Sequence, residues 1–102
     1  MLTLIKKLFN RKKTDFAELV KQGALIIDVR TQSEFRGGHI ERSKNIPLDQ
    51  LKTKIADLKK LNKPLITVCR SGARSAMAKS QLVSNGLVAY NGGPWNVLEK
   101  KI

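Results

Sequence analysis

The most reactive group in this sequence is the thiol of Cys69, the only cysteine present. It opens a short segment that holds two arginines, a glycine and two serines, Cys69-Arg70-Ser71-Gly72-Ala73-Arg74-Ser75. An ordinary thiol is mostly protonated at neutral pH, whereas the thiolate is the nucleophile. Neighbouring arginines and a helix N-terminus both lower the pKa of a thiol. The segment is therefore a candidate nucleophile surrounded by positive charge.

The other residues of this segment suit the binding of an anion. Gly72 allows a tight turn in which successive N–H groups point inward and form an anion-binding concavity. Arg70 and Arg74 carry planar, permanently charged groups that match the oxygens of sulfate, sulfonate or phosphate. Ser71 and Ser75 can donate hydroxyl hydrogen bonds, and Ser75 is also a candidate cap for the following helix. We expect the thiol to attack an anionic substrate and then to hold a charged covalent intermediate.

The alternative is that Cys69 is an inert part of the core, because buried cysteine behaves as a small apolar residue. Two arginines and a glycine within five residues are difficult to explain by packing alone. We therefore favour a reactive Cys69 over a structural one.

The segments around the cysteine predict an α/β domain. Short runs rich in branched apolar residues indicate buried strands at 25–29, within 40–46, at 65–68 and at 87–90, with a turn at 91–94. Apolar residues spaced by three and four indicate helices at 14–21, 33–36, 48–61, 75–84 and 95–101. This alternation predicts a small parallel β-sheet flanked by helices on both faces. Cys69 and the segment 28–30 then follow the carboxyl ends of two strands, where ligands bind in such sheets.

The length and charge of the chain limit the remaining interpretations. With 102 residues, we expect one folded domain at 14–102 behind a basic N-terminal tail at 1–13, which holds no acid. A helix lying on a membrane surface is the alternative for the tail. The net charge of +12 attracts small anions. A lone thiol suits a reducing compartment, so we expect the cytoplasm.

Nucleic acid and membrane are not expected partners. The positive charge comes without an aromatic or glycine-rich nucleic-acid motif, and one tyrosine and one tryptophan offer few surfaces for base stacking. No segment approaches the ~20 apolar residues that a membrane span needs.

Several short motifs, taken in order, resemble those of the rhodanese-like sulfurtransferases. They are Asp28-Val29-Arg30, Glu34-Phe35, Gly38-His39-Ile40, Asn45-Ile46-Pro47, the loop from Cys69 to Ser75, and Gly92-Gly93-Pro94-Trp95. The resemblance covers the chain from about Asp15 to its C-terminus. It implies a small α/β domain, without metal or cofactor, that carries a sulfane sulfur as a cysteine persulfide. It also implies thiosulfate as the donor and cyanide or a thiol, such as thioredoxin or glutathione, as the acceptor.

The same resemblance implies roles for individual residues. Cys69 matches the sulfur-accepting nucleophile, and Arg70 through Arg74 match the loop whose amides cradle the persulfide. Asp28 and Arg30 match a motif that supports this loop from the neighbouring strand.

Two further residues match the family pattern, and one pair of residues departs from it. His39 matches a turn residue, so we expect a hydrogen-bonded structural histidine rather than a general base. Trp95 is expected to pack the last helix on the sheet. Arg42-Ser43 stands where the family commonly has Gly-Ala, which predicts a reshaped turn with added positive charge.

Two other functions use a similar cysteine. Tyrosine and dual-specificity phosphatases have five residues between cysteine and arginine, whereas four residues separate Cys69 from Arg74. The shorter loop suits one sulfane sulfur better than a phosphoryl group, so a phosphatase or arsenate reductase is the weaker alternative. A persulfide relay in a thiolation pathway is the other alternative, and the same Cys69 serves it equally well.

Overall fold

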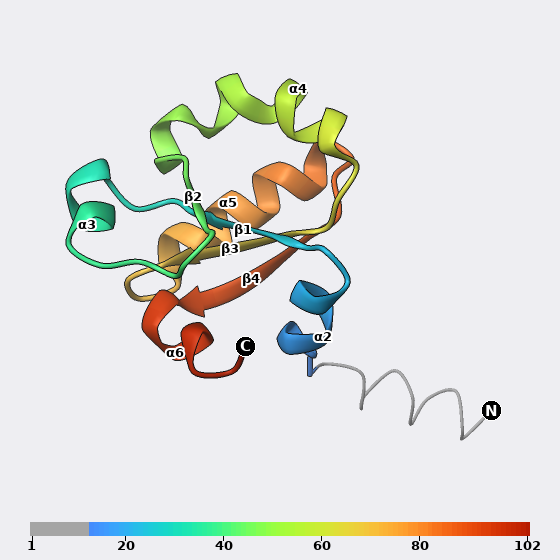
Figure 1. Ribbon diagram of the computed structural model, residues 1–102. Helices are drawn as coiled ribbons and strands as arrows, with labels where there is room; N and C mark the ends of the chain where they lie inside the picture. The colour runs from blue at the N-terminus through green and yellow to red at the C-terminus, as the bar shows by residue number, and fades with distance from the viewer. Residues whose placement is uncertain (1–12) are drawn as a thin grey trace.

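A four-stranded parallel sheet forms the centre of the protein, whose computed structural model describes residues 13–102. The strands are β1 (Leu25–Asp28), β2 (Lys44–Asn45), β3 (Leu65–Cys69) and β4 (Ala89–Pro94). Their order across the sheet is β2-β1-β3-β4, and every neighbouring pair is parallel. The carboxyl ends of all four strands therefore lie at one edge (Figure 1). Of the predicted basic tail, residues 1–12 lie outside the described residues.

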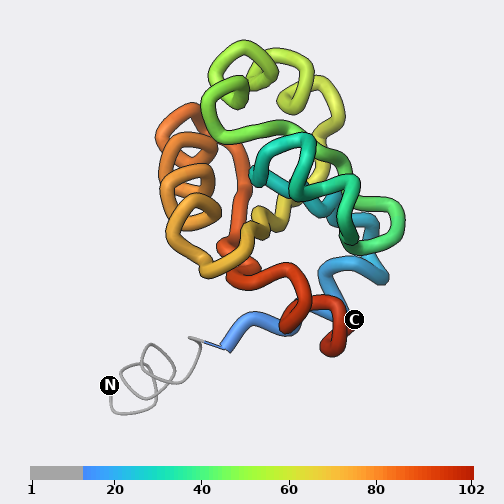
Figure 2. The backbone as a smooth tube through the Cα atoms, turned by 90° about the vertical axis from the view of Figure 1, so that its left-hand side faces the viewer, coloured from blue at the N-terminus to red at the C-terminus, as the bar shows by residue number. Residues whose placement is uncertain are grey.

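Helices cover both faces of this sheet, so the predicted fold class is confirmed. The elements are α2 (Phe16–Lys21), α3 (Gln32–Arg36), the 3-10 turn η1 (Leu48–Gln50), α4 (Leu51–Leu61), α5 (Ala73–Ser84) and α6 (Trp95–Glu99). Figure 1 has α4 on the side of the sheet opposite α2 and α6, and Figure 2 shows the same separation after a quarter turn. Within residues 13–102, no helix is both long and apolar enough to cross a membrane.

Strand β3 contributes to the core on both sides of the sheet, because successive strand residues point to opposite faces. Leu65 and Cys69 pack with apolar residues of α4 and α5. Ile66 and Val68 pack with those of α2 and α6. All five residues of β3 are buried, as expected for a parallel strand covered on both faces. Cys69 therefore sits at the end of a rigidly packed element.

Two helix starts differ from the prediction. Helix α2 is capped by Asp15 rather than Thr14, because the Asp15 carboxylate accepts a backbone hydrogen bond from the first turn at 3.1 Å. Helix α5 begins at Ala73 with Gly72 as its N-cap, so the prediction that Ser75 caps the helix is wrong. Ser75 instead lies within the first turn of α5.

Strand β4 also differs from the prediction, since it runs over Ala89–Pro94 rather than 87–90 and includes the expected turn at 91–94. Its pairing with β3 shifts by one residue at Gly92, which forms a β-bulge. A Cβ atom at Gly92 would lie 2.8 Å from Ile66 Cγ2. Gly92 thus allows β4 to approach β3 closely, and Gly93 adopts a positive φ of 77° within the strand.

The turn at Arg42 keeps a backbone shape that favours glycine. Arg42 has a φ of 71°, in the left-handed region that most side chains avoid. The Ser43 hydroxyl closes the turn by donating to the Ile40 carbonyl at 2.6 Å. Arg42 therefore occupies a backbone conformation that glycine adopts more readily.

Replacing Arg42 with glycine should raise the free energy of unfolding by about 1 kcal/mol, since glycine adopts a positive φ without steric penalty. Chemical denaturation measures this change. Arg42→Ala is the matched control, because it removes the same side chain and charge but keeps the Cβ atom. An equal gain in both variants would show that charge, and not backbone conformation, is responsible.

Candidate active site

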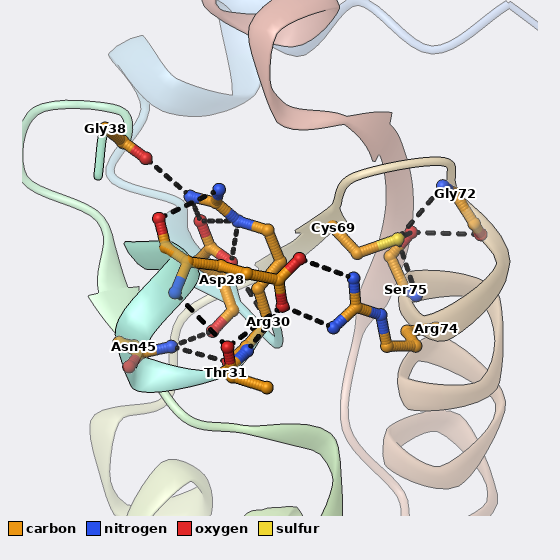
Figure 3. A network of polar contacts seen from close by, with 10 residues as sticks. Asp28, Arg30, Thr31, Gly38, Asn45, Cys69, Gly72, Arg74 and Ser75 are labelled. Atoms are coloured by element: carbon orange, nitrogen blue, oxygen red, sulfur yellow. Dashed lines mark hydrogen bonds and ion pairs between the residues drawn. The ribbon is translucent and has the colours of Figure 1, made fainter. Parts of the chain in front are cut away.

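The sulfur of Cys69 points at the first turn of α5 (Figure 3). It accepts N–H hydrogen bonds from Gly72 at 2.9 Å and from Ser75 at 3.4 Å, and it lies 3.4 Å from Ser75 Oγ. Burial raises the pKa of the Cys69 thiol. Hydrogen bonds from the Ser75 hydroxyl and from the amides of Ser75, Gly72 and Ser71 outweigh this effect, so the pKa lies below its ordinary value. The loop therefore favours the thiolate.

Gly72 makes this arrangement possible in two ways. Its φ of 99° gives the sharp turn between β3 and α5, a conformation that suits glycine. The N-cap of a helix normally offers a side-chain oxygen to the N–H of the second or third helical residue. Gly72 has no such oxygen, and the sulfur of Cys69 takes that position by accepting from Ser75, the third residue of α5.

Arg74 is bound by a carboxylate at the same edge of the sheet. Its guanidinium donates to both carboxylate oxygens of Glu34, with Nη1–Oε1 at 2.8 Å and Nη2–Oε2 at 3.0 Å. The hydrogen bond from Arg74, followed by that from the Thr31 N–H, lowers the pKa of Glu34 to about 2. The same contact raises the pKa of Arg74. One of the two arginines expected to bind an anion thus already has a partner.

Glu34 is a residue of the site that sequence reasoning quoted as part of a motif without giving it a role. A signal was present in the pattern Thr31-x-x-Glu34, which is typical of a capping box. The structure forms that box, with the Glu34 N–H donating to Thr31 Oγ1 and the Thr31 N–H donating to Glu34 Oε1. The box fixes Glu34 in the first turn after β1, at the edge where Cys69 also lies.

Asp28 and Arg30 form a buried ion pair at the end of β1. Arg30 Nη2 lies 2.7 Å from Asp28 Oδ2, and Arg30 Nε donates to both carboxylate oxygens. The guanidinium also donates to the Gly38 carbonyl at 2.7 Å and lies 4.8 Å from the ring centroid of Trp95. Asn45 Nδ2 donates to the carbonyls of Asp28 and Arg30 (Figure 3). These contacts join β1, β2 and α6 beside the loop.

His39 and Trp95 have the contacts that were predicted for them. The Nδ1 atom of His39 lies 2.7 Å from the Phe35 carbonyl, and the two rings stack with centroids 3.7 Å apart. Trp95 packs against the core cluster that contains Ile66 and Leu98, which holds α6 on the sheet.

Arg70 is placed differently from Arg74. Arg70, Ser71 and Ala73 are exposed, whereas Ser75 is buried. Arg70 lines an open groove of about 470 Å³ together with Trp95 and side chains of α3. In the part of the chain that the structure describes, no carboxylate forms an ion pair with Arg70. Of the two loop arginines, Arg70 is thus the exposed one without a carboxylate partner.

The arrangement combines a nucleophile with an anion-binding turn. The amides stabilise a negative charge on the sulfur, or on an atom bonded to it, and the exposed Arg70 adds positive charge to the same loop. Among residues 13–102, no group of three or more His, Cys, Asp or Glu side chains could hold a metal ion. The fold and this site define an α/β domain with a buried, hydrogen-bonded cysteine at the carboxyl edge of a parallel sheet.

Comparison with known proteins identifies the family. The family model of the rhodanese-like domain matches residues 12–97, so the chain belongs to the rhodanese-like family. The uncharacterized protein YqhL of Bacillus subtilis is 43% identical over 63 residues, which cover 62% of this chain and 49% of YqhL. Thiosulfate sulfurtransferase 18 of Arabidopsis thaliana is 36% identical over 81 residues, covering 67% of this chain and 60% of that protein. The chain thus spans less than two thirds of the length of these relatives.

Solved structures agree with this assignment. A rhodanese-related protein of Thermoplasma volcanium is 34% identical with a TM-score of 0.69, over 84% of this chain and 86% of that one. A rhodanese from E. coli, described with anions, is 28% identical with a TM-score of 0.67, over 72% of this chain and 89% of that one.

The ion pair between Glu34 and Arg74 should make stability depend on pH. Because the pKa of Glu34 falls from 4.5 to about 2 on folding, its contribution is complete above pH 4.5 and is lost as the pH falls toward 2. Both side chains are about one third exposed, so we expect less than about 1 kcal/mol. Unfolding of Glu34→Gln and the parent, compared from pH 2 to pH 6, measures this contribution.

The control for this experiment is Glu99→Gln, which removes a carboxylate that makes no ion pair within the described chain. A difference between Glu34→Gln and the parent that stays constant across the pH range would contradict the role given to the ion pair.

Proposed function

We propose that this chain is a sulfurtransferase that moves a sulfane sulfur from thiosulfate, or from a persulfide donor, to a thiophilic acceptor. The observation that carries the proposal is the position of the Cys69 sulfur, which accepts hydrogen bonds from the amides of Gly72 and Ser75. Membership of the rhodanese-like family supports it, as does a relative named thiosulfate sulfurtransferase.

In the first half-reaction, the Cys69 thiolate attacks the sulfane sulfur of thiosulfate. A new S–S bond forms, the S–S bond of thiosulfate breaks, and sulfite leaves with the bonding electron pair. The outer sulfur of the resulting persulfide carries the negative charge. Loop amides stabilise the dianionic donor and then this charge, together with the guanidinium of Arg70, which has no carboxylate partner among residues 13–102.

In the second half-reaction, a thiolate or cyanide attacks the outer sulfur of the persulfide. The S–S bond to Cys69 breaks, and Cys69 leaves as a thiolate. A lowered thiol pKa assists both steps, because it raises the fraction of nucleophile before the first step and makes a better leaving group in the second. A cytoplasmic location belongs to the same proposal, since a lone reactive thiol needs reducing surroundings.

The ion pair of Arg74 argues against the phosphatase alternative. Glu34 already accepts two hydrogen bonds from the Arg74 guanidinium and offsets its charge, which leaves less positive charge for a phosphoryl group. Turnover of a chromogenic phosphate ester, measured beside sulfur transfer from thiosulfate to cyanide, separates the two activities.

Intact mass spectrometry tests the persulfide directly. Incubation with thiosulfate should add the mass of one sulfur atom to the chain, and cyanide should remove it. Cys69→Ser should neither gain this mass nor transfer sulfur, because an alcohol cannot form a persulfide. Any turnover by Cys69→Ser, or a loaded sulfur that cyanide leaves in place, would contradict the mechanism.

The two loop arginines should contribute unequally to donor binding. Arg70→Ala should raise the KM for thiosulfate about tenfold, a loss of about 1.4 kcal/mol, because Arg70 has no carboxylate partner in the described chain. The double variant Arg74→Ala/Glu34→Gln should raise the KM less, because it removes an ion pair and leaves the net charge of the site unchanged. Steady-state kinetics with cyanide as the acceptor measure both values. A larger effect from the double variant would refute this ranking.

A further inference from the structure

The hydroxyl of Ser75 lies close to more acceptors than its single proton can serve. Its oxygen is 2.7 Å from Asn91 Oδ1, 3.1 Å from the Gly72 carbonyl oxygen and 3.4 Å from Cys69 Sγ. A serine hydroxyl donates one hydrogen bond, although it can accept two. Ser75 therefore donates to one of these three groups at a time, and the shortest contact is the one to Asn91.

Asn91 is held with its amide oxygen toward Ser75. The Gly93 N–H donates to Asn91 Oδ1 at 2.9 Å, and Asn91 Nδ2 lies 3.4 Å from the Gly72 carbonyl. Because an N–H group needs an acceptor, the contact with Gly93 decides which end of the amide is the oxygen. Asn91 and Gly93 flank the bulge at Gly92, so the irregular pairing of β4 creates this arrangement.

The backbone of Ser75 is fixed while its hydroxyl proton can turn. Ser75 is fully buried, its N–H donates to Cys69 Sγ, and its carbonyl accepts from Thr67 Oγ1 at 2.8 Å. Since Ser75 Oγ already lies within reach of both Asn91 and the sulfur, rotation about the C–O bond is sufficient to redirect the proton.

Which group accepts the hydrogen bond from Ser75 depends on whether Cys69 is a thiol or a thiolate. When Cys69 is a thiol, its S–H donates to Ser75 Oγ, and Ser75 donates to Asn91 Oδ1. When Cys69 is a thiolate, the sulfur has no proton, and Ser75 stabilises it only by turning its own proton away from Asn91. Asn91 Oδ1 then keeps the hydrogen bond from Gly93 and is not left without a donor.

We propose that Asn91 is a positioning residue that holds the Ser75 proton away from the sulfur and thereby opposes ionisation of Cys69. Asn91 Oδ1 and the Cys69 sulfur compete for the hydroxyl proton of Ser75. The hydrogen bond to Asn91 favours the thiol form of Cys69, whereas the charged thiolate attracts the proton to itself. The consequence for catalysis rests on the proposed function, because the thiolate is the form that attacks the donor and leaves in the second step.

Several charged groups lie at the same edge of the sheet as the sulfur, and the test must leave them in place. They are Arg74 with its partner Glu34, Asp28 with its partner Arg30, and the exposed Arg70. The Asn91 side chain forms no hydrogen bond with any of them in the described structure. Replacing Asn91 by alanine therefore changes no charge and breaks no ion pair.

The test measures the pKa of Cys69 in the intact chain, from the ultraviolet absorbance of the thiolate and from the pH dependence of alkylation. Alkylation of a thiol reports on Cys69, because the sequence has no other cysteine. The absorbance of ionised Tyr90 is removed by subtracting the titration of Cys69→Ser. Asn91→Ala should lower this pKa, with about threefold more thiolate at a pH below it, the effect of a modest change in one hydrogen bond. Ser75→Ala should raise it.

Two further variants separate the proposed role from a general change in the loop. In a Ser75→Ala background, adding Asn91→Ala should leave the pKa unchanged, because the proton that Asn91 holds is gone. Asn91→Asp keeps an acceptor and adds a negative charge, so it should raise the pKa. The proposal is overturned by an equal lowering in the Ser75→Ala background, by no lowering in Asn91→Ala alone, or by a lowering in Asn91→Asp.

The outcome of this experiment does not depend on whether the proposed function is correct. The pKa is measured without donor or acceptor, so the differences among variants stand even if thiosulfate does not load Cys69. Conversely, normal persulfide formation with no change of pKa in Asn91→Ala would remove the role of Asn91 and leave sulfur transfer intact.

Discussion

The site depends on one constraint, which is that the amides at the start of α5 need an acceptor. In most helices a side-chain oxygen at the N-cap meets this need. Here Gly72 has no side chain to offer, and the sulfur of Cys69 accepts from Gly72 and Ser75 instead. Cys69 is the last residue of β3, and the amides at the start of α5 form hydrogen bonds with its sulfur. A structural requirement of the helix is thereby converted into stabilisation of a negative charge on sulfur.

Two ion pairs hold the surroundings of the sulfur, and helix α3 connects them. Arg30 binds Asp28 within β1 and also donates to the Glu34 carbonyl, while the carboxylate of Glu34 binds Arg74 of α5. The buried pair is almost inaccessible to water, whereas the pair of Glu34 and Arg74 is about one third exposed. We therefore expect the buried pair to fix the framework. Breaking the exposed pair requires less free energy, because each ion remains hydrated when the contact breaks, so this pair can exchange partners more readily.

Local patterns predicted much of the fold, including the α/β class, the strand that ends at Cys69 and the tight turn at Gly72. These features follow from short apolar runs and from glycine, which act over a few neighbouring residues. The partner of Arg74 could not be found in this way, since Glu34 lies 40 residues away and a salt bridge leaves no periodic signal. The segment 91–94 predicts a turn because glycine allows chain reversal, whereas the structure uses Gly92 for close approach of β4 to β3. With a turn predicted there, no role is expected for Asn91, although the bulge places its side-chain oxygen within hydrogen-bonding distance of Ser75.

The burial of Cys69 has a consequence for oxidation as well as for transfer. The residue has no exposed surface, and the sequence contains no second thiol. Two folded molecules therefore cannot bring their sulfurs to bonding distance without moving the loop, which protects the protein against disulfide-linked dimers. The same burial applies to donor and acceptor, because either must reach a sulfur that has no exposed surface.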